Sequence, residues 1–256
     1  MNETLSLSLH ITRRNWTVYK KDFIANISPT ISDPIFMMFS LGVGLGGFIP
    51  EIEAKSYLQY LAPGLAASTA LLTSFFETSW GFYVRMTYEN VFKAMLTTPI
   101  GVREVALGEF IWVALKGGIM TIGTALVFMC FGLYSNPVTL PLAFVVGVLI
   151  ALSCGAIGLI ASCLVRNINQ FQTIYSFIIS PLFFFSGIFY PFDKMPPVLQ
   201  QLSFVLPLSH GVLMGQSLFW NQNILQTFLV HGGVLIVQSV VLCLIAYRLL
   251  IRKLQG

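Results

Sequence analysis

The stretch VTLPLAFVVGVLIALSCGAIGLIASCL, from Val138 to Leu164, contains no charged residue. A helix needs about 20 mostly apolar residues to cross the hydrocarbon core of a membrane, and this stretch is longer than that. Backbone that faces lipid must satisfy its own hydrogen bonds, so a continuous apolar run favours a helix over an open strand. The stretch therefore predicts a transmembrane span.

The rest of the chain has the composition of an integral membrane protein. Hydrophobic residues make up 56% of its 256 residues and charged residues only 9%, whereas soluble domains have roughly 25% charged residues. This deficit excludes an ordinary soluble enzyme, a disordered chain and a secreted disulfide scaffold. The four cysteines show no CxxC pair or metal-ligand spacing, so we expect small buried apolar residues rather than bridges.

Six stretches are long and apolar enough to span, which predicts an all-α membrane protein with six transmembrane helices. A β-barrel is disfavoured because the apolar runs are continuous rather than alternating. The predicted membrane domain covers residues 29–251 and is followed by a short tail at 252–256. Its spans are Pro29–Ile49, Tyr57–Val84, Val105–Leu133, Val138–Leu164, Phe171–Tyr190 and Leu225–Ile251.

The distribution of lysine and arginine predicts the orientation of these spans, because cytoplasmic loops carry an excess of both residues. With the N-terminus placed inside, only Lys55 and Lys194 lie outside and Lys116 lies within a span. Eleven basic residues are then cytoplasmic: Arg13, Arg14, Lys20, Lys21, Arg85, Lys93, Arg103, Arg166, Arg248, Arg252 and Lys253. An even number of spans places both basic termini on the same side, so we expect both termini in the cytoplasm.

Residues 1–28 are expected to form an amphipathic helix that lies on the inner leaflet and leads into the first span. Trp16, Tyr19, Phe23 and Ile27 follow helical spacing, and basic residues supply the opposite side. Aromatic rings of this kind favour the headgroup region. Ser28 followed by Pro29 then suits a new helix start.

The cytoplasmic loop 85–104 contains a second candidate helix, at about residues 87–97. Thr87 can cap it, and Thr98-Pro99 ends it. Its apolar side contains Phe92 and Met95, together with Val91 and Leu96. Such a face could fold against the bilayer or dock on a soluble partner, and composition alone does not decide between them.

The external segment of about 191–223 is interrupted by four prolines and is too broken to span. It predicts two short helices that dip into the outer leaflet or lie on it, with Pro207 and His210 at the start of the second. Non-spanning backbone at membrane depth must be covered by protein or line a cavity. We therefore expect this segment near the exit of any pathway.

Charged residues within the spans are expensive, at about 2.5–3.5 kcal/mol or more each near the helix centre. Glu109 and Lys116 are seven residues apart and share one face of the third predicted helix. Glu77, on the antiparallel neighbour, lies at a similar depth, so an ion pair between Glu77 and Lys116 is predicted. A packing role is favoured over substrate binding. No chain of carboxylates and histidines follows one helix, which disfavours a proton-driven pump.

Several sequence motifs occur in a recognisable order along nearly the whole chain. They are SDPIFMMFSLGVGLG at Ser32–Gly46, SYLQYLAPG at Ser56–Gly64, FET at Phe76–Thr78, YEN at Tyr88–Asn90, LGE at Leu107–Glu109, ISPLFFFSG at Ile179–Gly187 and LPLSH at Leu206–His210. The first resembles the first span of the ABC-2 type transporter permeases, and the set together is similar to the nodulation-factor (lipo-chitooligosaccharide) exporter subgroup of that family.

The resemblance implies a type V-like half-transporter in the bacterial inner membrane. It would pair with a second copy of the permease, as a homodimer, and recruit two separate ATPase subunits that bind ATP and magnesium. This chain contains no GxxxxGK[ST] loop of its own, and no cofactor or nucleic acid is expected on it. Residues 1–28 become the connecting helix. The residues implied to contact the ATPase are Tyr88, Glu89, Phe92, Met95 and Leu96.

The exported substrate implied by the subgroup is an amphiphile such as a lipooligosaccharide or polysaccharide. A hydrophobic drug or metabolite is the alternative within the same family. Two other classes are a membrane enzyme acting on a lipid-linked substrate and a channel or structural subunit. The enzyme would need a clustered nucleophile or metal set, which the sequence does not show. The channel would not depend on an ATPase.

Overall fold

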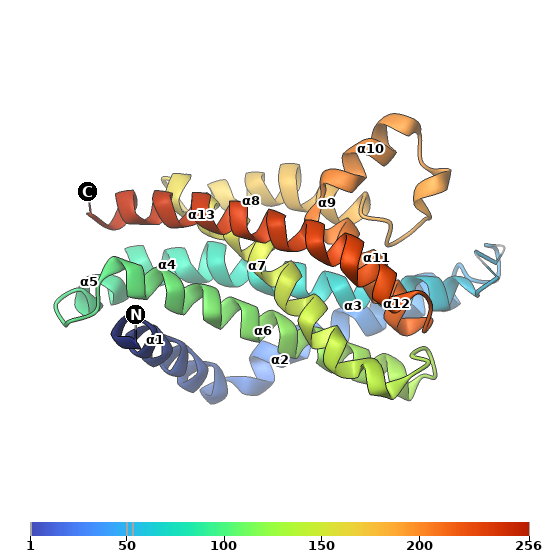
Figure 1. Ribbon diagram of the computed structural model, residues 1–256, viewed down its shortest axis with the longest axis horizontal. Coiled ribbons are helices and arrows are strands. Elements are labelled where there is room, and N and C mark those ends of the chain that lie inside the picture. Colours follow the sequence, from blue (N-terminus) through green and yellow to red (C-terminus); the bar gives the residue numbers. More distant parts are fainter. Residues whose placement is uncertain (1, 50, 53, 256) are drawn as a thin grey trace.

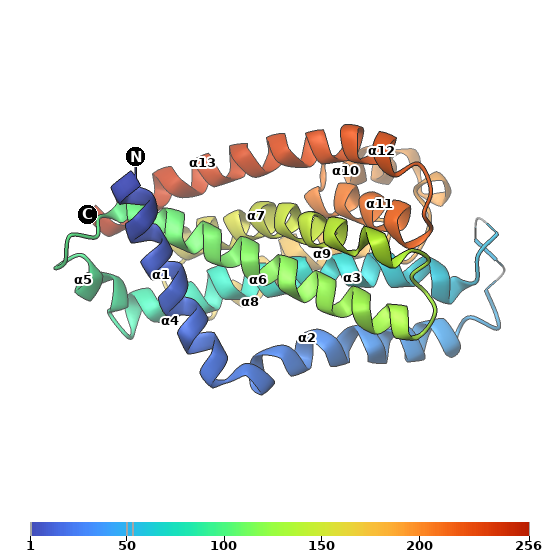
Figure 2. The same ribbon diagram turned by 60° about the horizontal axis from the view of Figure 1, so that its bottom comes forward.

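The computed structural model describes residues 2–49, 51–52 and 54–255, and these residues form an elongated bundle of helices (Figure 1). Within them the extended pairing is limited to an isolated antiparallel bridge between Ile52 and Lys55. Both termini and α5 lie at one end of the bundle (Figures 1 and 2). The all-helical prediction is confirmed for this part of the chain.

The helices follow one another through short loops, and several runs contain a π-helical or 3₁₀ segment, marked η. In chain order they are α1 (Asn2–Lys21), α2 (Phe23–Met37), η1 (Met38–Val43), α3 (Tyr57–Phe76), η2 (Glu77–Gly81), α4 (Phe82–Thr87), α5 (Val91–Met95), α6 (Val102–Cys130), η3 (Pro137–Thr139), α7 (Leu140–Leu164), α8 (Gln170–Ile174), η4 (Tyr175–Ile179), α9 (Ser180–Phe184), η5 (Phe192–Lys194), α10 (Pro197–Val205), α11 (Pro207–Phe219), α12 (Ile224–Thr227), η6 (Phe228–Gly232) and α13 (Gly233–Gln255).

Helix α7 lies at the centre of the bundle and packs against α3, α6, α11 and α13. Close approach is possible because small residues line the contacts, as is usual between membrane helices. A methyl group added to Gly117 of α6 would clash with Ala151 of α7, and one added to Gly158 of α7 would clash with Thr78. The apolar core of the bundle is therefore built around the uncharged stretch Val138–Leu164.

Among the described residues, three helical runs are long and apolar enough to cross a membrane, namely Val102–Cys130, Pro137–Leu164 and Ile224–Leu254. The bent pair α10 and α11, which meet at 88°, would make a fourth. These runs agree with the predicted third, fourth and sixth spans to within a few residues. The other three predicted spans correspond to helical runs that are shorter or more polar.

The predicted fifth span is too long, because its helical run ends at Phe184 rather than at Tyr190. The run Gln170–Phe184 rises about 22 Å, which is less than the hydrocarbon core of about 30 Å. The chain then leaves the helix through Gly187, whose φ of +78° favours glycine. The predicted pair of short external helices corresponds to α10 and α11.

The N-terminal helix differs from the prediction in two respects. The break between α1 and α2 lies at Asp22, not at Ser28 and Pro29, which lie inside α2. In addition, α1 packs along α6, where Tyr19 is buried and its ring lies 5.7 Å from that of Trp112, between centroids. The prediction that Tyr19 meets lipid headgroups is therefore wrong, because tertiary packing covers it.

Candidate functional site

Four charged side chains from η2, α4 and α6 form one connected cluster inside the bundle. Oε1 of Glu77 lies 2.6 Å from Nη1 of Arg85, and Oε2 of Glu77 lies 2.6 Å from Nζ of Lys116. The second guanidinium nitrogen of Arg85, Nη2, lies 2.8 Å from Oε2 of Glu109. Glu77 and Lys116 are thus in contact, as their spacing predicts, and Arg85 links them to Glu109. The two negative and two positive charges of the cluster cancel.

Arg85 belongs to this cluster because of the local helix geometry. Eight residues of regular α-helix turn through about 800°, which leaves the two ends roughly 80° apart around the axis. The intervening segment η2 is π-helical, from Glu77 to Gly81, and a π-bulge accommodates an additional residue in a turn. Glu77 and Arg85 therefore lie on the same face. The sequence analysis missed Arg85, although its basic character at this spacing from Glu77 is visible in the sequence.

Glu109 is fully buried, and its carboxylate is paired with Arg85 and Asn15. Besides Arg85, it accepts a hydrogen bond of 3.0 Å from the side-chain amide of Asn15 on α1. One residue earlier on α6, the carbonyl of Gly108 accepts a bond of 3.1 Å from the Thr12 hydroxyl. A buried charge is tolerable only when it is paired and hydrogen-bonded, so the cluster also holds α1 against α6. Sequence reasoning did not identify Asn15.

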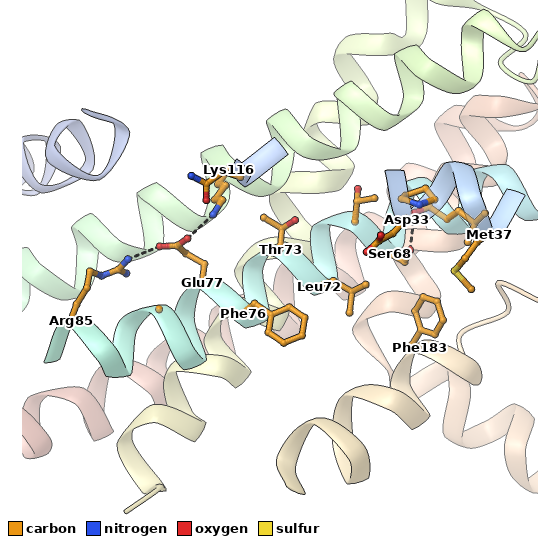
Figure 3. Close-up of a pocket in the computed structure, with 15 residues that line it drawn as sticks. Asp33, Met37, Ser68, Leu72, Thr73, Phe76, Glu77, Arg85, Lys116 and Phe183 are labelled. Atoms are coloured by element: carbon orange, nitrogen blue, oxygen red, sulfur yellow. Dashed lines mark hydrogen bonds and ion pairs between the residues drawn. The ribbon is translucent and has the colours of Figure 1, made fainter. Parts of the chain in front are cut away.

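Two cavities adjoin the cluster. The α2–α3 cavity, of about 370 Å³, is lined by apolar side chains such as Leu72, Phe76 and Phe183 and also by polar ones such as Asp33 and Thr73 (Figure 3). The α1–α6 cavity, of about 400 Å³, lies between α1, α4 and α6. Both have the size of small-molecule sites. The residues common to both linings are Asn26, Glu77, Gly81, Arg85 and Lys116.

The structure corrects the predicted ATPase contact at Phe92. Only 1% of Phe92 is exposed, and its ring stacks on Phe82 with centroids 4.6 Å apart. It cannot present its side chain to a partner in this state, because it anchors α5 to the bundle. Met95 and Leu96 are half-buried. The exposed residues of this loop include Tyr88, Glu89 and Lys93.

The loop helix is also shorter than predicted. Thr87 is the last residue of α4 instead of a helix cap, and α5 covers only Val91–Met95. Asn90 precedes it in the left-handed region, with φ of 53°. Asparagine tolerates this conformation better than most residues. The sharp turn at Asn90 folds the apolar side of α5 back onto the bundle.

At the other end of the bundle, Pro207 and His210 lie on α11, which is largely buried. Nδ1 of His210 lies 3.0 Å from Nδ1 of His231, and its Nε2 lies 2.9 Å from the carbonyl of Phe204. Since a carbonyl only accepts, Nε2 of His210 is the donor in that bond. The pair joins α11 to η6, so the role visible for His210 is one of packing.

The chain matches the family model described as "ABC-2 type transporter" over residues 7–220. It belongs to the ABC-2 type transporter family. Nodulation protein J of Rhizobium leguminosarum bv. viciae is 31% identical over 96% of this chain and 94% of that protein. Nodulation protein J of Rhizobium meliloti (strain 1021) is 29% identical over 95% and 92%, respectively.

A more distant relative, the inner membrane transport permease YadH of Escherichia coli (strain K12), is 23% identical over 88% of this chain and 87% of that protein. The resemblance inferred from the motifs is therefore confirmed. As a member of the ABC-2 type transporter family with several apolar helices, the chain is a multi-pass membrane protein and the membrane component of a transport system. The charged cluster and its two cavities lie within the matched region.

The ion pair between Glu77 and Lys116 can be tested by a double-mutant cycle. Lys116→Met is expected to destabilise the permease by about 1–3 kcal/mol, because Glu77 loses one of two charged partners but keeps Arg85. Glu77→Gln should also destabilise it, and the double variant should recover part of the summed loss. Thermal unfolding of the purified permease in detergent measures these effects. Strict additivity of the two losses would contradict direct coupling.

Proposed function

We propose that this chain is the permease subunit of an ATP-driven bacterial exporter, with the transport pathway formed in the membrane and ATP hydrolysed on a separate subunit. The observation that carries the proposal is the family match over residues 7–220. The chain contains no P-loop sequence, which is consistent with a separate ATPase. Two copies of the permease and two of the ATPase, with ATP and magnesium bound to the ATPase, complete the proposed assembly.

In this assembly the chain crosses the inner membrane six times. Five crossings are helical throughout, namely the three apolar helices, Phe23–Val43 and Tyr57–Thr87. The sixth combines the short run Gln170–Phe184 with the non-helical stretch after it, in which Ser186 and Ile188 are buried in the protein, and α10 and α11 form an external hairpin. The position of both termini and α5 at one end of the bundle supports an even number of crossings (Figure 2). Residues of η6 and α13, such as Leu229, Val237 and Leu244, are exposed and apolar, which suits contact with lipid or a second copy.

The orientation makes a direct prediction for cysteine labelling. A cysteine at Lys55 or Lys194 is expected to react with a membrane-impermeant maleimide added to intact cells, because the distribution of basic residues places both sites outside. A cysteine at Lys93 is expected to react only after the membrane is opened. Reaction of a cysteine at Lys93 in intact cells would contradict the proposed topology.

We propose an amphiphilic substrate, such as a lipooligosaccharide or polysaccharide. The support is the similarity to proteins named for nodulation, together with a partly apolar cavity that adjoins a charged cluster. A substrate with a lipid part and a polar part would contact both the cavity and the charged cluster. A hydrophobic drug would contact only the cavity.

The test is ATPase stimulation in the reconstituted complex. The permease is co-expressed with candidate P-loop ATPases from the same genome, purified and placed in vesicles. Lipid-linked oligosaccharides are expected to stimulate ATP hydrolysis several-fold, and hydrophobic drugs are not. Stimulation by drugs alone would favour the alternative substrate class, whereas failure of any ATPase to co-purify would contradict the proposed assembly.

A further inference from the structure

Where α11 meets the last helical run, at the end of the bundle opposite both termini (Figures 1 and 2), two histidines are in contact. Nδ1 of His210 lies 3.0 Å from Nδ1 of His231, and Nε2 of His210 lies 2.9 Å from the carbonyl oxygen of Phe204. Because that carbonyl only accepts, Nε2 carries the single ring hydrogen of a neutral His210, and its Nδ1 is an acceptor. Nδ1 of His231 therefore donates to it. The two bonds link α10, α11 and η6.

One additional proton does not disrupt this contact. Nε2 of His231, on a half-buried side chain, can take up a proton while Nδ1 of the same ring continues to donate, and the bond is then charge-assisted and stronger. A second proton can be placed only on Nδ1 of His210, which is the acceptor of the contact. Two N–H groups on two positively charged rings would then face each other across 3.0 Å. The contact therefore tolerates one additional proton and is incompatible with two.

The main packing partners of α11 supply no carboxylate that would stabilise two charged rings. These partners are α3, α7, α10, α12, η6 and α13, and none of them contains an aspartate or a glutamate. Besides the two histidines, the titratable side chains of these elements are Tyr57, Tyr60, Cys154, Cys163, Cys243, Tyr247, Arg248, Arg252 and Lys253. Arg248 lies about 25 Å from His231 along the helix, and the other two basic residues lie farther away. Asp193, on the exposed η5 before α10, is paired with Lys194 at 3.8 Å.

The histidine pair is the titratable part of the contact between the α10–α11 hairpin and the last helical run. Two side-chain hydrogen bonds between described residues join the hairpin to the run Ile224–Leu254. They are the histidine pair and a bond of 3.1 Å from the side-chain amide of Gln238 to the carbonyl of Val205. The amide bond does not change with pH. Charging both histidines would therefore remove one of the two bonds and put electrostatic repulsion in its place.

We propose that His210 and His231 form an acid-sensitive latch, which holds the α10–α11 hairpin against the last helical run until both rings are charged and then releases it. The latch responds to the pH of the compartment at this end of the bundle, which is the cell exterior in the proposed topology. The inference goes beyond the proposed exporter function. It rests on the geometry of the contact and is independent of the transported substrate.

The direction of the pH effect follows from the number of protons that each state binds. The closed pair takes up at most one additional proton, whereas the two separate histidines of the released hairpin take up two, so acid favours release. Release should begin as the pH falls through the range in which exposed histidines become charged, at about 6.5. Below that range the ratio of closed to released hairpin should fall by about tenfold per pH unit, because the two states differ by one proton.

The first measurement is the charge of each ring, by NMR of the permease labelled with isotopes at histidine and purified in detergent. The chain has three histidines, and His10, which is exposed on α1, is the internal reference. At about pH 8 the hydrogens should lie on Nε2 of His210 and on Nδ1 of His231. On acidification the pair should take up its two protons in separate steps, the second at a lower pH than the single step of His10. If both rings became charged together with His10, the latch would be rejected.

The second measurement is the position of the hairpin, by electron spin resonance distances between labels at Gln201 on α10 and Leu244 on α13, which are both exposed. The exposed Cys130 is replaced by serine so that it takes no label. Between about pH 8 and about pH 5 the permease is expected to gain a population with a longer distance between the labels. His231→Gln should reduce that population by about tenfold or more at the lower pH, because glutamine can still donate to His210 or accept from it but carries no charge.

His10→Gln is the matched control, because it removes the exposed histidine and leaves the pair intact. This variant should release the hairpin as the unchanged permease does. Equal release in His231→Gln would overturn the proposal, and so would an unchanged distance at a pH where both rings are charged. If His231→Gln does not insert, His210→Gln removes the second charge from the other ring and is expected to give the same result. Neither measurement needs an ATPase, so failure of the exporter proposal would leave both unaffected.

Discussion

Arg85→Met is expected to cause the largest loss of stability among single changes in the charged cluster. The guanidinium pairs with both Glu77 and Glu109, and its removal leaves the fully buried carboxylate of Glu109 with only the amide of Asn15 as a side-chain partner within the described residues. Removing one partner of a buried ion pair typically costs about 3–5 kcal/mol. Thermal unfolding in detergent and the yield of inserted protein measure the effect.

Arg103→Met is the control, because Arg103 is exposed on the first turn of α6 and makes no ion pair within the described residues. Its effect should stay within about 0.5 kcal/mol, as for surface substitutions in general. The loss of stability in Arg85→Lys should lie between those of Arg85→Met and Arg103→Met, since an ammonium can pair with one carboxylate but does not reproduce the two-pronged contact of the guanidinium group. If Arg85→Met were as stable as Arg103→Met, the cluster would not contribute to the fold.

The second large effect is expected at the loop between α4 and α6. Phe92→Ala should destabilise the loop and its contacts by about 3–5 kcal/mol, because it removes a fully buried aromatic side chain. Phe92 packs with Phe82, Val105 and Leu159 in one apolar cluster. The loss should appear as a lower Tm and as faster proteolysis between α4 and α6.

Tyr88→Ala separates stability from coupling, because the Tyr88 side chain is 61% exposed. The free energy of unfolding of this variant should stay within about 0.5 kcal/mol of that of the unchanged permease. The variant should lose substrate-stimulated ATP hydrolysis if this loop contacts the ATPase. If Tyr88→Ala kept full substrate-stimulated ATP hydrolysis and only Phe92→Ala lost it, the loop would act through packing and not through a contact at Tyr88.

Much of the architecture follows directly from the sequence. A run such as Val138–Leu164 has no charged residue, and its backbone can satisfy its hydrogen bonds in lipid only by forming a helix, so helix formation and membrane insertion are dictated locally. The contact between Glu77 and Lys116 was also predictable, because the depth of a residue in an antiparallel pair depends only on its distance along each helix.

The rotation of each helix about its axis was decided only by the tertiary structure. Arg85 joined the cluster through the π-helical segment at Glu77–Gly81, and Asn15 joined it because α1 packs along α6. Phe92 lies on a five-residue helix, too short for its apolar residues to define a face, so whether it met the bundle or a partner depended on the turn at Asn90. Composition and spacing determine which segments are apolar and how deep they lie, whereas the partner of each side chain depends on packing between segments distant in sequence.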